Sequence, residues 1–204
     1  MNTKITFINK SFDANNSKVV IFQKSVATNL KSTSTAWKVI EHCGYNWSHE
    51  FIYSSSFDVA VKDSYNNHSD KKAATPGDKW VVKQNRRGNS IELDSSNAVN
   101  RDEVEVKNEL DLGSIDAHVY KQGSIVVSRK GIPPGQKAIF KLEPYIYVGV
   151  HAQVYEGEAL NAAILNDKNM QFSLRGINEA QLIMTGGGVG RSAVPFEFEL
   201  VPIS

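Results

Sequence analysis

The sequence has a single cysteine, Cys43, in 204 residues. One cysteine cannot form a disulfide within the chain, so the fold does not depend on an oxidising compartment. No stretch approaches 18 consecutive apolar residues, and the sequence therefore predicts no membrane-spanning helix. The opening residues, 1–7, lack the charged and apolar regions of a secretory signal. We expect a cytoplasmic protein, with export by a signal-free route as the alternative.

An excess of charge of either sign is also absent. Lys and Arg number 23 and Asp and Glu number 22, which leaves a net charge of +1. Nucleic acids and anionic membrane surfaces both attract proteins with a surplus of basic residues. The overall composition therefore gives no reason to expect either of them, and we predict no nucleic-acid partner.

Familiar catalytic motifs are missing as well. The chain has neither the Gly-x-Ser-x-Gly pattern of serine hydrolases nor the His-x-His pair of metal-binding cupin barrels. The weak metal candidates are His42, Cys43 and His49, because imidazole and thiolate are good transition-metal ligands. Their spacing matches no standard zinc pattern, and the alternative places Cys43 in the core. We predict no catalytic residue, no cofactor and no enzymatic activity.

Short runs of β-branched and aromatic residues dominate what is present. Residues 4–9 and 19–23 read as strands that would form an opening hairpin, and residues 103–110 alternate well between polar and apolar. From Gly113 onward, turn signals recur about every 8–12 residues, with strands that include 145–155 and 160–165. This rhythm is typical of a β-sandwich or barrel.

A helix is expected at one place at most. Within residues 28–44, Ser34 or Thr35 could cap a short helix near 34–43 that ends at Gly44, although Trp37 and Ile40 are equally good strand formers. The predicted fold is therefore all-β: an antiparallel β-sandwich, with a jelly roll as one form of it. We expect a single domain over residues 1–204, and the polar stretch 94–102 is the natural seam if there are two sub-blocks.

Two stretches and one further aromatic residue are candidates for binding. Tyr145 and Tyr147 lie two apart on a strand and share a face with His151, which could be a binding surface or sandwich core. Gly187, Gly188 and Arg191 belong to a glycine-rich connection between strands, which could contact a ligand or another subunit. Trp47 is the further candidate, since aromatic rings with polar groups suit sugars, lipid headgroups and protein interfaces.

These observations support three hypotheses about function. The leading one is a non-catalytic binding or self-assembly protein that acts through surface loops and strand edges, such as an edge at residues 103–110. Its partner could be a second copy of the chain, in a homo-oligomer. The first alternative is a membrane-active or glycan-binding protein of the toxin or lectin type. The second alternative is a metal-dependent enzyme that uses His42, Cys43 and His49.

Overall fold

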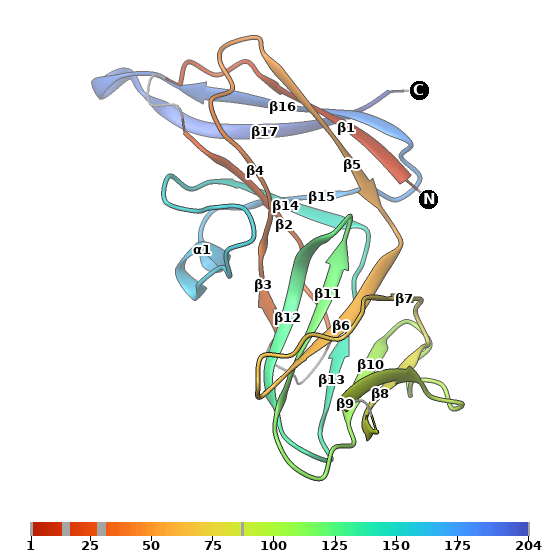
Figure 1. Cartoon of the computed structure of the whole chain (residues 1–204). Helices are drawn as coiled ribbons and strands as arrows, with labels where there is room; N and C mark the ends of the chain where they lie inside the picture. The colour runs from red at the N-terminus through yellow and green to blue at the C-terminus, as the bar shows by residue number, and fades with distance from the viewer. Residues whose placement is uncertain (1, 14–16, 28–31, 87, 204) are drawn as a thin grey trace. The chain divides into compact units, whose positions relative to one another are not determined.

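A computed structural model describes residues 2–13, 17–27, 32–86 and 88–203 of the chain. The chain forms two compact units, drawn in Figure 1. Unit 1 consists of Met1–Phe22, Ala36–Ser55 and Pro144–Ser204, and unit 2 consists of Gln23–Thr35 and Ser56–Glu143. The predicted seam at residues 94–102 lies within unit 2, so the division does not follow it. That the whole chain forms one domain stays a prediction.

Unit 1 is a sandwich of two four-stranded sheets. One sheet has the order β17 (Val194–Pro202), β16 (Glu179–Gly187), β1 (Asn2–Asn9) and β5 (Ser48–Ser54). The other has the order β15 (Met170–Ser173), β14 (Tyr145–Val150), β2 (Val19–Phe22) and β4 (Ala36–Ile40). The ring of Trp37 on β4 meets Phe51 and Tyr53 on β5 edge-on, at centroid distances of 6.0 and 6.2 Å. These contacts join the inner faces of the two sheets.

Unit 2 also contains two sheets. The first has the order β13 (Lys137–Phe140), β10 (Val104–Asn108), β8 (Lys79–Asn85) and β9 (Gly88–Leu93). The second has the order β3 (Thr33–Ser34), β12 (Ser124–Ile132), β11 (Ile115–Lys121), β6 (Phe57–Asp63) and β7 (Lys72–Ala74). Alternating apolar residues of these strands are buried, for example Val59, Val61, Ala117 and Val119. The all-β sandwich prediction is therefore confirmed.

The pairing of the strands corrects two predictions. The strand at residues 4–9 and the strand at 19–23 do not form a hairpin, because β1 pairs with β16 and β5 whereas β2 pairs with β14 and β4. The stretch 103–110 is not an edge, because β10 lies between β13 and β8. Two pairs are parallel, β1 with β16 and β8 with β10, and the other pairs of described strands are antiparallel.

The helix lies elsewhere than predicted. Residues 34–40 of the predicted helix belong to β3 and β4 and the bridge between them, residues 41–43 lie in the loop that follows, and residues 28–31 of the longer candidate lie outside the described residues. The segment around Trp37 is a strand because this conformation buries the indole ring between the two sheets. The short helix α1 (Ala162–Asn166) occupies the predicted strand at 160–165, because the Asn161 side chain caps it by accepting a hydrogen bond from the Ile164 amide. No helix among the described residues is long and apolar enough to cross a membrane.

Candidate functional site

Three segments meet at one end of unit 1, beyond the last residue of β1. They are residues 10–13 after β1, residues 41–47 between β4 and β5, and residues 186–194, which connect β16 to β17 (Figure 1). Together they expose five large apolar side chains. We call this set the aromatic tip: Phe12, Tyr45, Trp47, Val189 and Val194.

The first and third segments are held together by the backbone. The parallel pairing of β1 with β16 continues past Asn9, because the Lys10 amide donates to the Met184 carbonyl at 2.8 Å. The Phe12 amide then donates to the carbonyl of Gly186, and its carbonyl accepts from the Gly188 amide, both at 2.8 Å. Phe12 is therefore fixed alongside the glycine-rich connection.

The glycine-rich connection can take this course because its residues lack side chains. Gly187 has φ +83°, a left-handed conformation that other residues rarely adopt. A Cβ atom there would lie 2.9 Å from the Phe196 ring and 3.0 Å from the Phe12 backbone. Close approach of Phe12 therefore requires glycine at this position. Beyond Gly188, residues Gly190–Ser192 form a single 3-10 turn that exposes Arg191.

Asn9 anchors the second segment. Its side chain is buried, donates to the Cys43 carbonyl at 2.5 Å, and accepts from the amide and hydroxyl of Ser11 at 2.9 and 2.6 Å. Its backbone amide donates to the Trp47 carbonyl, and its carbonyl accepts from the Asn46 amide. One residue thus ties residues 43–47 to the end of β1.

Backbone geometry in this loop is unusual as well. His42 and Asn46 have φ of 54° and 62°, in the left-handed region that few non-glycine residues occupy. The Trp47 amide donates to the Gly44 carbonyl, and the indole ring lies against Gly44, where a Cβ atom would be only 3.6 Å away. The loop is therefore bonded into one conformation that directs Tyr45 and Trp47 outward.

The aromatic rings of the tip are largely in solvent. Phe12 is 72% exposed, Trp47 is 67% exposed and Tyr45 is 56% exposed. Phe12 and Tyr45 stack on each other with ring centroids 5.8 Å apart and an interplanar angle of 13°. Exposed apolar groups that gather in one place mark contact surfaces far more often than scattered ones do. The arrangement is therefore able to cover an apolar or planar surface of a ligand.

Two cationic side chains lie in the same segments. Lys10 and Arg191 are both exposed. Glu41 forms an ion pair with Lys18 at 2.8 Å, whereas Asp13 accepts hydrogen bonds from the neutral Ser17, which do not cancel its formal charge. Lys10, Lys18 and Arg191 outnumber these two carboxylates by one, so the tip is weakly basic although the chain as a whole is nearly neutral.

The structure does not bring the predicted Tyr145, Tyr147 and His151 to the tip. Tyr147 stacks on Phe22 with centroids 5.4 Å apart, in a cluster on the outer face of the second sheet of unit 1. Residues 151–169, including α1, cover this cluster with Val154 and Leu160. Tyr145 is half-buried on the same strand. Tyr147 therefore has a packing role, which agrees with the core interpretation of this face.

His151 belongs to the covering segment. Its Nε2 lies 3.0 Å from Oδ1 of Asn169, and its Nδ1 lies 3.8 Å from a carboxylate oxygen of Asp167. A Cβ at Gly149 would overlap the Asn169 side chain and lie 2.8 Å from His151 Nε2. Gly149 thus leaves the space that His151 and Asn169 fill, and the histidine joins the two ends of the covering segment.

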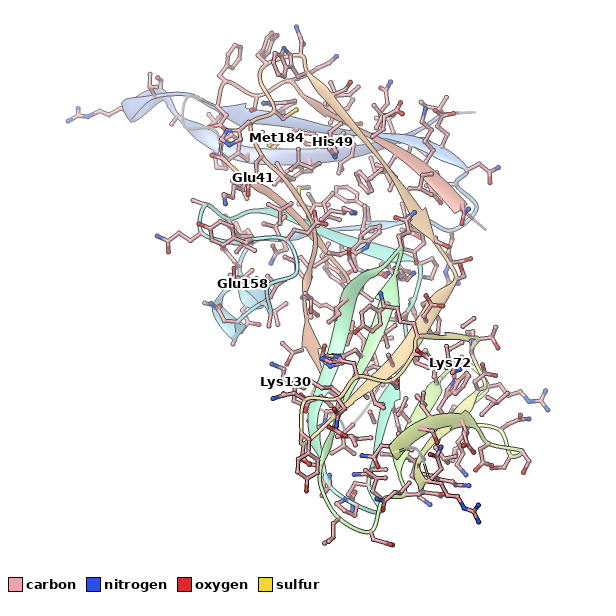
Figure 2. All side chains as sticks on the ribbon, in the orientation of Figure 1. Glu41, His49, Lys72, Lys130, Glu158 and Met184 are labelled. Atoms are coloured by element: carbon pink, nitrogen blue, oxygen red, sulfur yellow. The ribbon has the colours of Figure 1, made fainter. Side chains whose placement is uncertain are left out.

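The three weak metal candidates do not converge. His42 is exposed next to Glu41, and the Cys43 Sγ lies 3.5 Å from the carbonyl oxygen of Trp47. His49 lies on β5 opposite Phe7 of β1, at the end of unit 1 that also holds Glu41 and Met184 (Figure 2). No group of three or more His, Cys, Asp or Glu side chains suited to a metal exists among the described residues. Burial raises the pKa of the Cys43 thiol, which disfavours the nucleophilic thiolate.

A hollow of about 380 Å³ lies at the other end of β1. Its lining includes Asn2, Ile52 and Asn178 together with the ion pair between Lys4 and Glu50, whose N–O distance is 2.9 Å. None of the predicted site residues lines it. Because Glu179 also lies 3.7 Å from Lys4, the charged groups of this hollow are already paired with one another.

Four residues proposed from the sequence, Trp47, Gly187, Gly188 and Arg191, lie in the three segments of the tip, whereas Phe12, Tyr45 and Val194 were not among the sequence candidates. The alternation of β1 contained a usable signal. Thr3, Ile5, Phe7 and Asn9 are buried, so continued alternation places the even-numbered Phe12 on the exposed side. Tyr45 and Trp47 share the same two-residue spacing.

No protein-family model, no curated protein and no solved structure matches this chain. Its function therefore has to be inferred from its own geometry.

Proposed function

We propose that this protein is a non-catalytic binding protein that contacts its ligand through the aromatic tip of unit 1. The observation that carries the proposal is the exposure of Phe12, Tyr45 and Trp47 on loops that are bonded in place. Leaving an aromatic side chain in water forgoes about 1.5–3 kcal/mol of burial free energy. Three such rings on an ordered surface are best explained by a partner that covers them.

The ordering of the loops supports binding over chance exposure. Asn9 uses its side chain and both backbone groups to fix residues 43–47, and Gly187 allows Phe12 to lie against the hairpin. A binding surface that is already ordered loses less entropy when a ligand arrives. The tip thus has the pre-organisation expected of a contact site.

The strand-edge form of the binding hypothesis has less support. The nine-residue edge strand β17 carries Pro195, Glu197, Glu199 and Pro202. Proline cannot donate to a neighbouring strand, and repeated negative charge repels a second copy of the same edge. We therefore favour loops over edges as the contact surface.

The proposal is tested with one variant and three probes. The triple variant Phe12→Ser, Tyr45→Ser, Trp47→Ser removes the rings without touching buried residues. Wild type and variant are compared by vesicle co-sedimentation, by glycan array and by sedimentation velocity for self-association. If the proposal is right, wild type binds in at least one of these assays. The triple variant should lose that binding while its melting temperature stays the same as that of wild type.

A matched control keeps the comparison specific. Tyr65→Ser, Val99→Ser, Leu112→Ser removes three even more exposed apolar side chains from unit 2 and should leave binding intact. The proposal would be overturned if the control variant lost binding to the same extent, or if wild type showed no binding in any of the three assays.

A further inference from the structure

We propose that the ligand of the aromatic tip is the interface of a lipid membrane that carries anionic headgroups. This inference rests on the proposed function and adds the chemistry of the partner. It follows from three properties of the tip: the kinds of residue that it exposes, the charges around them, and the engagement of the buried polar side chains Asn9 and Ser11 within the loop.

The exposed residues have the composition of an interfacial anchor. Trp and Tyr favour the region between lipid headgroups and acyl chains, because their rings are apolar and their N–H or O–H groups can remain hydrated. Trp47 and Tyr45 supply such groups, and Phe12 stacks on Tyr45 as a purely apolar neighbour. Val189, at the turn of the hairpin, adds an exposed aliphatic side chain. Shallow insertion of these side chains would remove them from water.

Charge complementarity points to anionic lipids. Lys10 lies two residues from Phe12 in the sequence, and Arg191 lies two residues from Val189, so each of these two apolar side chains has a cationic side chain near it in the sequence. Of the nearby carboxylates, Glu41 is paired with Lys18, and Asp13 accepts hydrogen bonds from Ser17 that leave its formal charge in place. With Lys18 counted, three cations stand against two carboxylates, so the tip has a surplus of one positive charge. A cation close to an anionic bilayer strengthens binding by about fivefold.

A glycan fits the tip less well. Specific sugar binding combines a ring platform with side chains that donate and accept hydrogen bonds. Here the buried polar side chains next to the platform, Asn9 and Ser11, already bond to each other and to the backbone. Their hydrogen-bonding groups are used to shape the loop.

A second copy of the chain also fits less well. In a two-fold dimer through the tip, the same patch would face itself. The surplus of positive charge that Lys10 and Arg191 give to the patch would then lie against the same surplus on the other copy. Like charges brought together in this way disfavour association.

The test uses the full chain and vesicles of two compositions: phosphatidylcholine alone, and phosphatidylcholine mixed with phosphatidylglycerol. Wild type should co-sediment with the anionic vesicles and far less with the neutral ones, and added salt should weaken binding. Lys10→Gln, Arg191→Gln should bind the anionic vesicles roughly twenty-five-fold more weakly, at about fivefold for each cation. The triple aromatic variant should not bind either composition.

A charge-matched control separates local from overall charge. Arg86→Gln, Arg101→Gln removes two exposed cations from unit 2 and should leave vesicle binding unchanged. Equal binding to both compositions, or equal weakening by the two charge variants, would overturn the inference.

The remaining outcomes distinguish this inference from the proposed function. Suppose that wild type binds a glycan or itself but not vesicles, and that the triple aromatic variant loses this binding. The membrane inference then fails and the binding function stands. If no probe depends on the tip, both fail.

Discussion

Asn9 offers the sharpest test of how the tip is built. Replacing it by alanine removes three side-chain hydrogen bonds, one to the Cys43 carbonyl and two from Ser11. A buried intramolecular hydrogen bond contributes about 0.5–1.5 kcal/mol net, so the three together give about 1.5–4.5 kcal/mol. The lost partners are buried or half-buried, which favours the upper half of this range. We expect Asn9→Ala to lower the free energy of unfolding by about 3 kcal/mol.

Two companion variants give this prediction its controls. Ser11→Ala removes only the hydroxyl donation to Asn9 and should cost about 1 kcal/mol. Asn2→Ala changes an exposed asparagine at the far end of β1 and should be neutral. Urea unfolding, followed by circular dichroism, measures all three.

The same variants report on the order of the tip. If Asn9 holds residues 43–47, then Asn9→Ala should also weaken the binding signal of the tip, because a loosened loop must be ordered again on contact. An Asn9→Ala protein within 0.5 kcal/mol of wild type, with unchanged binding, would refute the assignment of Asn9 as the positioning residue.

Three further predictions concern buried groups outside the tip. Lys121 is 1% exposed, and burial lowers its pKa to about 7 from the ordinary 10.5, so the unfolded chain binds the proton more tightly. The free energy of unfolding should therefore rise by up to about 5 kcal/mol between pH 7 and 10.5, and urea unfolding should show that Lys121→Met lacks this rise. Burial lowers the pKa of His118 to about 4 from the ordinary 6.5, so the free energy of unfolding of wild type should fall by up to about 3 kcal/mol as the pH drops from 6.5 to 4. The free energy of unfolding of His118→Gln should fall less over the same range, and equal losses in the two proteins would contradict this. Gly149→Ala should displace the Asn169 side chain and lower the melting temperature, and because Gly149 lacks the positive φ that Gly157 has, the loss reports the steric overlap alone; an unchanged melting temperature would contradict this.

The sequence was sufficient for the fold class because strand periodicity is a local signal. Residues 57–63 alternate strictly, and Phe57, Val59 and Val61 are buried in β6 as their spacing predicts. The helix at 34–43 was wrong for a reason beyond local sequence: Trp37 is buried between two sheets, and that packing determines the conformation. At 160–165 the opposite error arose, because the capping role of Asn161 was overlooked.

Strand partners were not predictable from neighbours along the chain. β1 and β2 follow each other but enter different sheets, and the partners of β1 come from β5 and from the distant β16. Residues 103–110 resemble a protected edge because of their charges, yet Glu105 is buried and forms an ion pair with Lys137 at 2.8 Å. Charge on a strand therefore did not identify its position in the sheet.

The candidate site was only partly predictable for the same reason. Trp47 and the glycine-rich connection were candidates from residue type, but the connection meets Phe12 through the parallel pairing of β1 with β16, and Trp47 reaches the end of β1 through its bond to Asn9. No local pattern encodes a contact between residues near the two ends of the chain. Tyr147 shows the converse, since an aromatic residue on a well-formed strand turned out to pack against Phe22.

Quenching of Trp47 by brominated lipid is the most direct measurement of membrane contact at the aromatic tip. Of the three tryptophans, Trp37 and Trp80 are buried and only Trp47 is exposed. Anionic vesicles that contain brominated acyl chains should quench the wild-type emission strongly and shift it to the blue, and Trp47→Phe should abolish most of that change. Equal quenching of wild type and Trp47→Phe, or no quenching of either, would contradict contact through the tip.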